Sequence, residues 1–298
     1  MNRATYFIED KAIFGSYPNQ EEVNYYESIG VKHFFDLTTY GECEPYQHSG
    51  VLIKYPIEDM NVPHEPFKFT ALITYACDLV KTFKRGEKIF VSCRGGHGRA
   101  GVFVACVLAK YHNISPEDAL QLTKKYHSER KEMKSRWRKM GSPQTQKQRV
   151  FVIKMFSPFY FKTDCIREEF GMKSHHSIHM NGKYGIDTAN NSEDLYKLLK
   201  TRINEEMTED TVVKIMMFVQ KLKCEQNRDF LYNLMNTYSR PIVFYTEDDR
   251  LWGVDKDGLG KNLLGRILVS IRDEYYSTQS FNILKGNIDF LNENNKDD

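Results

Sequence analysis

Closely spaced cysteines are missing from this sequence. Its six cysteines in 298 residues include no CxxC pair, so neither a zinc site nor a disulfide framework is expected. Long apolar runs are missing too, because no window approaches the roughly 18 to 20 continuous apolar residues that span a bilayer. The first residues also lack the apolar stretch of a secretory signal. We therefore expect a reduced, intracellular protein, cytoplasmic or nuclear, with no metal, no cofactor and no membrane span.

The chain does have enough apolar material for well-filled cores, with 41% hydrophobic and 13% aromatic residues. Its length of 298 residues favours two domains of ordinary size. The net charge of +2 is unevenly distributed, because residues 124–149 hold ten lysines and arginines against two glutamates. Such a run is either a solvated helix face or a field that attracts an anionic substrate, such as a phosphoprotein, a phospholipid head group or an RNA end.

The first half of the chain alternates between strand and helix patterns. Short apolar runs predict strands over 12–15, 31–37, 51–55 and 88–92, of which the last three are expected to be buried. Apolar residues at helical spacing predict helices over 20–29, 66–84 and 99–111, and a fourth opens with Ser115 as N-cap and Pro116 at its first position. This alternation indicates an α/β domain over residues 1–156, with a central, mostly parallel sheet flanked by helices.

The composition changes after residue 156, since residues 157–191 are less periodic and rich in glycine, histidine, asparagine and serine. We place a domain boundary there and expect a second, mainly helical domain over residues 157–298. Its predicted helices cover 192–203, 209–223, 227–236 and 262–275, with one strand over 241–245. The polar tail over 292–298 is expected to fray.

The segment between the predicted strand 88–92 and helix 99–111 carries the strongest chemical signal. It has the pattern Cys-x5-Arg, with Cys93 and Arg99 at its two ends and three glycines between them. The glycines let backbone N–H groups point into one hollow, and the following helix directs its positive end there. Such a hollow binds an oxyanion and favours a thiolate, and an arginine can donate two parallel hydrogen bonds to a phosphoryl group. The loop residues expected to bind the substrate phosphate are Arg94, Gly95, Gly96, His97 and Gly98.

This loop resembles the signature of the protein tyrosine phosphatase superfamily, His-Cys-x-x-Gly-x-x-Arg-Ser/Thr. The resemblance extends over residues 1–156 and is closest to the small dual-specificity phosphatases and the kinase-associated phosphatases. It implies a cysteine-dependent phosphatase that hydrolyses phosphotyrosine, phosphoserine or phosphothreonine through a phosphocysteine, with Cys93 as nucleophile. Its substrate would be a phosphorylated protein or another anionic phosphate compound.

Two further segments occur in the order that the family has them. Residues 55–63 resemble the general-acid loop, and the resemblance assigns the acid to Asp59, with Glu58 as the alternative. One carboxyl can protonate the leaving group and then activate water. Residues 141–148 resemble the end of the catalytic domain, whose glutamine can lie near the attacking water. Gln144 and Gln148 are the candidates for this second step, although glutamines in a polar segment are usually solvated.

The loop departs from the family pattern at two positions. Ser92 stands where a histidine usually orients the loop, and Ala100 stands where a hydroxyl usually stabilises the departing thiolate. Loss of such a polar group slows a step by ~10- to 1000-fold. The sequence is therefore compatible with a slow enzyme and with a phosphate-binding adaptor whose catalysis is impaired. A phosphatase of RNA 5′ ends or nucleotides is a further alternative.

The segment from 237 to 272 resembles the C-terminal signature of the NADAR family, a helical fold whose members cleave N-glycosidic bonds. The match is good over residues 205–276, and Asp249 and Trp252 match the Asp-Arg-x-Trp-Gly motif. The Glu-His pair of that family's front half is not found, so the domain is expected to be partial or degenerate. Asp249 and Trp252 then form a pocket for a nucleotide-like ligand, or Asp249 and Arg250 form a structural pair beneath Trp252.

Overall fold

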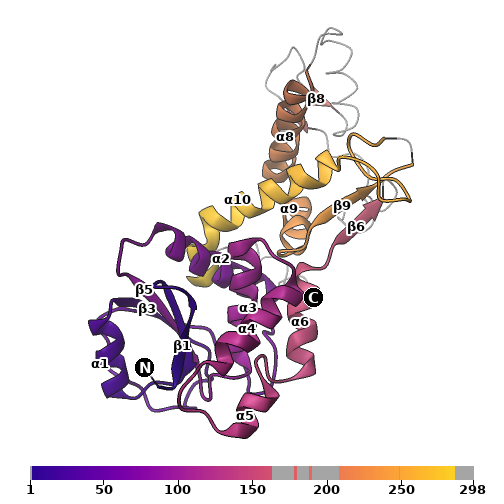
Figure 1. The fold of residues 1–298 in the computed structure, drawn as a ribbon. Helices are drawn as coiled ribbons and strands as arrows, with labels where there is room; N and C mark the ends of the chain where they lie inside the picture. The colour runs from indigo at the N-terminus through magenta and orange to yellow at the C-terminus, as the bar shows by residue number, and fades with distance from the viewer. Residues whose placement is uncertain (1, 163–177, 180–187, 190–207, 248, 286–298) are drawn as a thin grey trace, which may run out of the picture. The chain divides into compact units, whose positions relative to one another are not determined.

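The computed structural model describes residues 2–162, 178–179, 188–189, 208–247 and 249–285 (Figure 1). The predicted helix over 192–203 and the polar tail over 292–298 lie outside these residues. Internal contacts divide the chain into two compact units, Met1–Phe156 and Ser157–Asp298. No helix within the described ranges is long and apolar enough to cross a membrane.

The first unit is built on a five-stranded sheet of order β1-β2-β5-β3-β4. Strand β1 (Ala4–Ile8) runs antiparallel to β2 (Ala12–Ser16), whereas β2, β5 (Lys88–Cys93), β3 (Val31–Asp36) and β4 (Val51–Lys54) pair in parallel. The expected α/β fold with a mostly parallel sheet is confirmed. The sequence pattern did not indicate β1; it predicted β4 correctly as a strand but was wrong in expecting it to be buried. This edge strand leaves Val51 49% and Leu52 40% exposed, because it has a neighbour on one side only.

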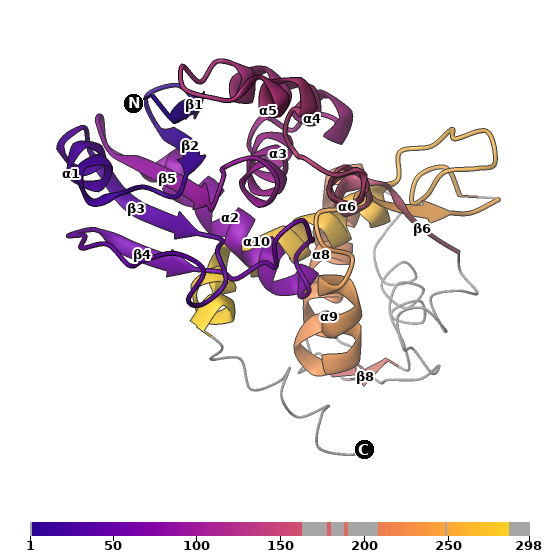
Figure 2. The ribbon, with the colours of Figure 1, turned by 90° about the horizontal axis from the view of Figure 1, so that it is seen from below.

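Helices cover both faces of this sheet, as the view from below shows (Figure 2). Helix α1 (Gln20–Ser28) places Val23 and Tyr26 against Ile13, Phe34 and Phe90 of one face. The opposite side holds α2 (Pro66–Thr82), α3 (Arg99–His112), α4 (Pro116–Ser128) and α6 (Gln146–Phe156), with α3 in contact with the other three. Ser115 caps α4 by accepting a hydrogen bond from the backbone N–H of Asp118, as expected. A short helix, α5 (Ser135–Met140), and α6 were not predicted.

Strand β5 lies at the centre of the sheet and is buried along its whole length. Its close approach to the end of α1 depends on Gly30, which has φ +100° and whose added Cβ would meet the Gly86 carbonyl oxygen at 1.9 Å. Because β5 ends at Cys93 and α3 begins at Arg99, the Cys-x5-Arg loop emerges from the carboxyl end of the parallel sheet. In open α/β sheets this is the edge at which ligands bind.

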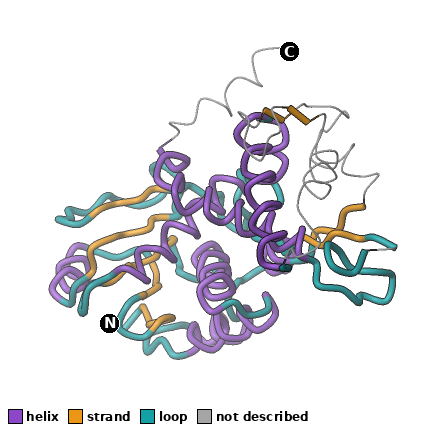
Figure 3. The backbone as a smooth tube through the Cα atoms, turned by 90° about the horizontal axis from the view of Figure 1, so that it is seen from above, coloured by secondary structure: helices purple, strands orange, loops and turns teal. Residues whose placement is uncertain are grey.

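The second unit is mainly helical, as the tube coloured by secondary structure shows (Figure 3). It contains α8 (Glu209–Gln226), α9 (Arg228–Met235) and α10 (Leu263–Lys285), together with β9 (Ile242–Tyr245). Strand β9 pairs in parallel with β6 (Phe159–Lys162), which was not predicted, and β7 (Ile178–His179) pairs with β8 (Thr188–Ala189). Helix α10 continues to Lys285, beyond the predicted end at Tyr275.

Candidate active site

The Cys-x5-Arg loop encloses Cys93, whose side chain is buried with 2% of the residue exposed. The loop lies tightly against β2, because a Cβ added at Gly96, which has φ +69°, would meet the Gly15 carbonyl oxygen at 2.4 Å. The backbone N–H of Tyr17 donates to the Arg94 carbonyl at 3.3 Å, and the Arg94 side chain is exposed. The glycine at position 96 is therefore required by a close approach as well as by its backbone conformation.

Arg99 is fully buried, with 1% of the residue exposed, and four of its contacts are to oxygen atoms. Its Nη1 and Nη2 atoms donate to the two carboxylate oxygens of Glu42 at 2.7 and 2.6 Å, and Nη1 also donates to the Ile57 carbonyl at 2.9 Å. Asp59 Oδ1 lies 3.1 Å from Nη2. Nε has no hydrogen-bond partner among the described residues. Since guanidinium has five N–H donors and both Nη atoms already contact oxygens, Nε is the donor that remains for a phosphoryl group.

Glu42 is the functional residue that the sequence reasoning missed. It grips Arg99 with both oxygens and accepts hydrogen bonds from the backbone N–H and the hydroxyl of Thr39. The hydrogen bonds from Arg99 lower the pKa of Glu42 to about 2, although burial acts in the opposite direction. Burial works against the Arg99 charge, but the Glu42 hydrogen bonds and the Cys93 and Asp59 charges outweigh it and raise the Arg99 pKa. Glu42 lies in a turn 57 residues before Arg99, so no local spacing reveals the pair.

The two carboxylates of the acid loop have different surroundings. The Asp59 side chain is 69% exposed and contacts Arg99, so it stands at the mouth of the loop. Glu58 instead accepts a hydrogen bond from Asn61 at 3.0 Å and lies 3.5 Å from His64 Nε2. Those neighbours lower the pKa of Glu58, with the Asn61 hydrogen bond the largest cause. The geometry therefore favours Asp59 over Glu58 as the proton donor.

Gln148 is buried beside the loop, and it is not solvated as polar glutamines usually are. A Cβ added at Gly98 would meet its amide at 2.9 Å, so glycine at that position allows the contact. Gln148 Nε2 donates to the Asn61 carbonyl at 2.9 Å, and Gln144 Nε2 lies 3.1 Å from Met60 Sδ. Both candidate glutamines therefore reach the acid loop, but only Gln148 also touches the phosphate loop.

The His97 side chain, expected to contribute to phosphate binding, is half-buried and packs against residues that follow the loop in sequence. Its Nδ1 lies 2.7 Å from Nε2 of His127, and its ring is stacked on Trp137 with centroids 5.0 Å apart. Burial lowers the pKa of His97 to about 4 and that of His127 to about 3, with Arg130 adding to both shifts. His97 therefore joins the loop to α4 and α5 as a neutral side chain.

The two departures from the family pattern leave the loop with few hydroxyl contacts. Ala100 is fully buried, and the Ser92 hydroxyl is buried without a hydrogen-bond partner among the described residues. Ser142 donates to the His97 carbonyl at 2.6 Å and supports the loop from outside. Within the described residues, five cysteines are free thiols, and no group of three or more His, Cys, Asp or Glu could hold a metal ion.

The basic run is only partly a solvated face. Arg138 donates to the carbonyl oxygens of Ser128 and Arg130. Its guanidinium therefore stabilises the turn after α4, in addition to any contact with solvent. Lys147 Nζ donates to Asn61 Oδ1 at 2.6 Å on the acid loop, and the Arg136 guanidinium lies 4.5 Å from the Trp137 ring centroid. Two cations of the run are thus attached to segments that border the phosphate loop.

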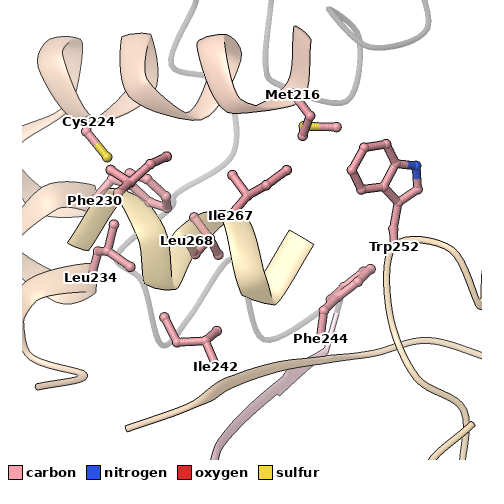
Figure 4. Close-up of a cluster of buried hydrophobic side chains, with 10 residues drawn as sticks. Met216, Cys224, Phe230, Leu234, Ile242, Phe244, Trp252, Ile267 and Leu268 are labelled. Carbon is pink, nitrogen blue, oxygen red and sulfur yellow. The ribbon is translucent and has the colours of Figure 1, made fainter. Parts of the chain in front are cut away.

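The signature residues of the second unit have structural contacts. Asp249 Oδ1 accepts hydrogen bonds from the backbone N–H groups of Leu251 and Trp252 at 3.0 and 3.1 Å. Arg250 pairs with Asp255 at 2.6 Å, so the predicted pair of Asp249 with Arg250 is wrong. Trp252 is 5% exposed and lies in the core with Met216, Phe244 and Ile267 (Figure 4). The aromatic ring expected to stack on a ligand is therefore used for packing.

The glycines of this signature allow close backbone packing. An added Cβ would meet the Phe244 carbonyl oxygen at 2.5 Å from Gly253 and the Ile242 carbonyl oxygen at 2.1 Å from Gly265. A cavity of about 450 Å³ opens between α8, α9 and α10, where Lys221, Arg228 and Tyr275 are among the lining residues. Asp249 and Trp252 do not line this cavity.

Comparison with known proteins agrees with both parts of this description. Residues 5–152 match the family described as "Swiss Army Knife protein, DSP-PTPase phosphatase domain", and residues 168–275 match the NADAR domain. The NADAR match begins earlier than the stretch over 205–276 that the sequence pattern supported best. The chain is 41% identical over 169 residues to "Putative tyrosine phosphatase 067L" of Invertebrate iridescent virus 3, covering 55% of this chain and 69% of that protein.

The chain belongs to the DSP-PTPase phosphatase family, with a C-terminal NADAR domain. Over 274 residues it is 30% identical to "Putative tyrosine phosphatase 197R" of Invertebrate iridescent virus 6, and the match covers 90% of each chain. It is also similar to the structure described as "Crystal structure of Tk-PTP in the active form", at 19% identity and a TM-score of 0.41, over 51% of this chain and 94% of that chain. The phosphatase domain implies a phosphate-bearing substrate.

Proposed function

We propose that this DSP-PTPase family member hydrolyses phosphate monoesters of the phosphotyrosine, phosphoserine or phosphothreonine type through a phosphocysteine. The observation that supports the proposal is the buried Nε donor of Arg99, which has no partner among the described residues and lies at the start of the helix that follows Cys93. Glu42 fixes the Nη1–Nη2 edge of the guanidinium, so this donor is oriented before substrate arrives. Such preorganised donors stabilise the charge that develops in a transition state.

In the first step the Cys93 thiolate attacks phosphorus, and an S–P bond forms while the bond from phosphorus to the leaving oxygen breaks. Arg99 and the loop N–H groups hold the equatorial oxygens. Asp59, in its protonated form, gives its proton to the leaving alkoxide or phenoxide. The distance of 3.1 Å between Asp59 Oδ1 and Arg99 Nη2 supports this role, because Arg99 is the proposed partner of the phosphoryl group.

In the second step a water molecule attacks the phosphocysteine, and the Asp59 carboxylate takes the proton of that water. The S–P bond breaks, the electron pair returns to sulfur, and inorganic phosphate leaves. Gln148 is the side chain best placed to hold the water, because it contacts both Gly98 and the acid loop. Besides the phosphate ester, water is the one reactant that these two steps take from outside the chain.

Turnover of a small aryl phosphate tests the assignment. Cys93→Ser should abolish turnover but retain binding of inorganic phosphate, since Arg99 and the amides remain. The half-buried Cys43, outside the loop, provides the control variant Cys43→Ala, which should keep wild-type turnover. Residual activity of Cys93→Ser above about 1% of wild type would remove Cys93 from its role.

A phosphate-binding adaptor is the second candidate, and Ala100 is the observation that favours it. No hydroxyl at this buried position can donate to the departing thiolate, so breakdown of the phosphoenzyme should be slow. Rapid-quench kinetics should show a burst in the wild type and faster breakdown in Ala100→Ser. Absence of a burst, with no gain in the variant, would show that another group compensates for the missing hydroxyl.

The physiological substrate can be sought among phosphopeptides, phosphoinositides and RNA with a 5′ triphosphate. Lys147 and Arg136 border the loop and would favour a highly charged substrate, including an RNA 5′ end or a nucleotide. Changing Arg136 and Lys139 to Ala should then lower kcat/KM for the charged substrate but not for the aryl phosphate, and added salt should reduce the difference. Equal losses on both at every salt concentration would assign these residues to the fold.

The NADAR domain is proposed to bind a nucleotide-like ligand without cleaving it through Asp249. Both hydrogen bonds that Asp249 accepts are from its own turn, which is a structural use of the carboxylate. The full-length protein should therefore not cleave ADP-ribosylated guanosine, and calorimetry with ADP-ribose tests binding. Cleavage that is lost in Asp249→Ala but kept in Cys93→Ser would overturn this proposal.

A further inference from the structure

A second buried arginine, Arg130, lies over the Phe14 ring of β2 and has no part in the steps above. It follows α4, and only 2% of the residue is exposed. Its guanidinium lies 4.4 Å from the centroid of the Phe14 ring. Arg138 donates to its backbone carbonyl at 2.8 Å, which fixes the chain at this point. The Phe14 ring and the hydrogen bond from Arg138 therefore both constrain the position of Arg130.

The strand register relates Arg130 to Cys93. Phe14 of β2 pairs with Val91 of β5, and Ser16 pairs with Cys93. Alternate residues of a strand point to the same face, so Phe14, Val91 and Cys93 share the face that carries α3 and α4. Val91, the register partner of Phe14, precedes Cys93 by two residues on β5. Two residues of a strand span about 7 Å, so Phe14 and Cys93 are separated by about this distance along the strand direction. The Arg130 guanidinium is thus on the side of the sheet toward which the Cys93 thiol points.

The charge of Arg130 has little compensation from hydrogen bonds. Its Nε and Nη2 atoms are buried and have no partner in the described part of the chain. An unpaired buried cation is costly, so a neighbouring anion is expected to offset it. Burial lowers the pKa of Arg130 to about 10, while the charges of Cys93 and Tyr26 act in the opposite direction.

The other titratable groups around Arg130 do not supply that anion. His97 and His127 have pKa values lowered to about 4 and about 3 by burial, so they are neutral at pH 7. Burial raises the pKa of Tyr26 on α1, so its hydroxyl is neutral as well. Arg138 carries the same sign of charge as Arg130. Cys93 lies on the same side of the sheet, and a thiolate there would be an anion of opposite charge, since the attraction between two charges stabilises both.

We propose that Arg130 is a positioning residue whose buried charge stabilises the Cys93 thiolate from beneath the loop. This rests on the proposed role of Cys93 as nucleophile. Arg99 acts on the substrate side of the sulfur, whereas Arg130 acts from the side of the sheet. The second cation favours the thiolate in a loop where Ser92 and Ala100 provide no hydrogen bond for it.

Alkylation by the neutral reagent iodoacetamide, followed at Cys93 by mass spectrometry across pH 5 to 9.5, tests the proposal without requiring turnover. Arg130→Met and Arg130→Gln should both slow alkylation of Cys93 at pH 6 by about 10- to 100-fold, which moves the midpoint of the profile upward by about one to two pH units. Arg130→Lys keeps the charge and should restore most of the rate. Lys131→Met removes the adjacent exposed charge and should leave the profile unchanged.

The wild-type chain contains its own comparison, because Cys43 is half-buried and burial raises its pKa. At pH 6 Cys93 of the wild-type protein should react about 10 times faster than Cys43. This comparison uses no Arg130 variant, so it can be made even if those variants fail to fold. A Cys93 that reacts no faster than Cys43, or a folded Arg130→Met with an unchanged midpoint, would overturn the proposal. Fast alkylation without phosphatase turnover would instead overturn the proposed function and leave the role of Arg130 intact.

Discussion

Each of the two domains contains a glycine-bearing signature whose arginine pairs with a carboxylate, but the two signatures are used differently. In the phosphatase domain Glu42 holds the Nη1–Nη2 edge of Arg99, and Nε has no partner among the described residues. In the NADAR domain Arg250 pairs with Asp255, and Asp249 caps its own turn. The first signature therefore keeps a buried donor without a partner, whereas the polar groups of the second signature are satisfied within the fold.

The glycines show the same difference. Gly98 leaves space for the Gln148 amide, which bridges to the acid loop and so brings a polar side chain to the site. Gly253 and Gly265 leave space for carbonyl oxygens of β9, which packs the turn and α10 onto that strand. A glycine pattern therefore indicates where two chain segments approach closely, and the approaching atoms decide whether a site results.

The largest effect should come from a matched pair of arginine substitutions. Arg99→Lys should lower kcat/KM for an aryl phosphate by about 1000-fold, because lysine cannot replace the two-edged contacts to Glu42 and the phosphate. Arg250→Lys, which changes the exposed partner of the buried Asp255 in the other domain, should leave this activity at the wild-type level. Similar losses in both variants would mean that the second signature also contributes to the phosphatase site.

Trp252→Ala should have the largest effect on stability in the second domain. Removal of this core side chain should cost about 3 to 5 kcal/mol, since it leaves a cavity against Phe244 and Ile267. Hydrogen exchange should show loss of protection in β9 and α10, while β5 and α3 keep theirs. Unchanged protection in β9 and α10, together with weaker ADP-ribose binding, would instead support Trp252 as a ligand-stacking ring.

Glu42→Gln should lower kcat/KM by about 10- to 100-fold, because it removes the charge that orients Arg99 but keeps the side-chain shape. Thermal unfolding should change little in comparison, since the amide can still accept one hydrogen bond from Arg99. Thr39→Val serves as the control, because it removes a hydrogen bond to Glu42 without touching Arg99. Equal kinetic losses in the two variants would point to the turn itself and not to the Glu42–Arg99 pair.

The smallest effect is a pH dependence of stability in the phosphatase domain. His97 and His127 have folded-state pKa values of about 4 and about 3, below the ordinary 6.5, so the unfolded chain binds more protons between these values. Stability should be full above pH 6.5 and should fall as the pH decreases from 6.5 toward 4. Denaturant unfolding of the wild type and of His127→Gln measures this, and the variant should show a shallower decline. An identical decline in both would exclude the pair as its cause.

The sequence determined the phosphatase half well because its signals are local. Cys93, three glycines and Arg99 occur within seven consecutive residues, and the strand before them and the helix after them follow from apolar periodicity. The spacing alone therefore placed Cys93 and Arg99, the proposed nucleophile and phosphate-binding arginine, at the carboxyl end of a buried strand. The mostly parallel sheet and the helical second domain followed from the same periodicity.

Contacts between distant segments were decided only by the tertiary structure. Glu42 reaches Arg99 across 57 residues, and Arg130 comes beneath the loop because α4 returns along the sheet face that carries Phe14. In the second domain the motif around Asp249 and Trp252 has the spacing of a site, yet core packing uses the ring and the turn uses the carboxylate. Residue spacing fixes which groups are neighbours along the chain, but burial and pairing depend on which segments fold against them.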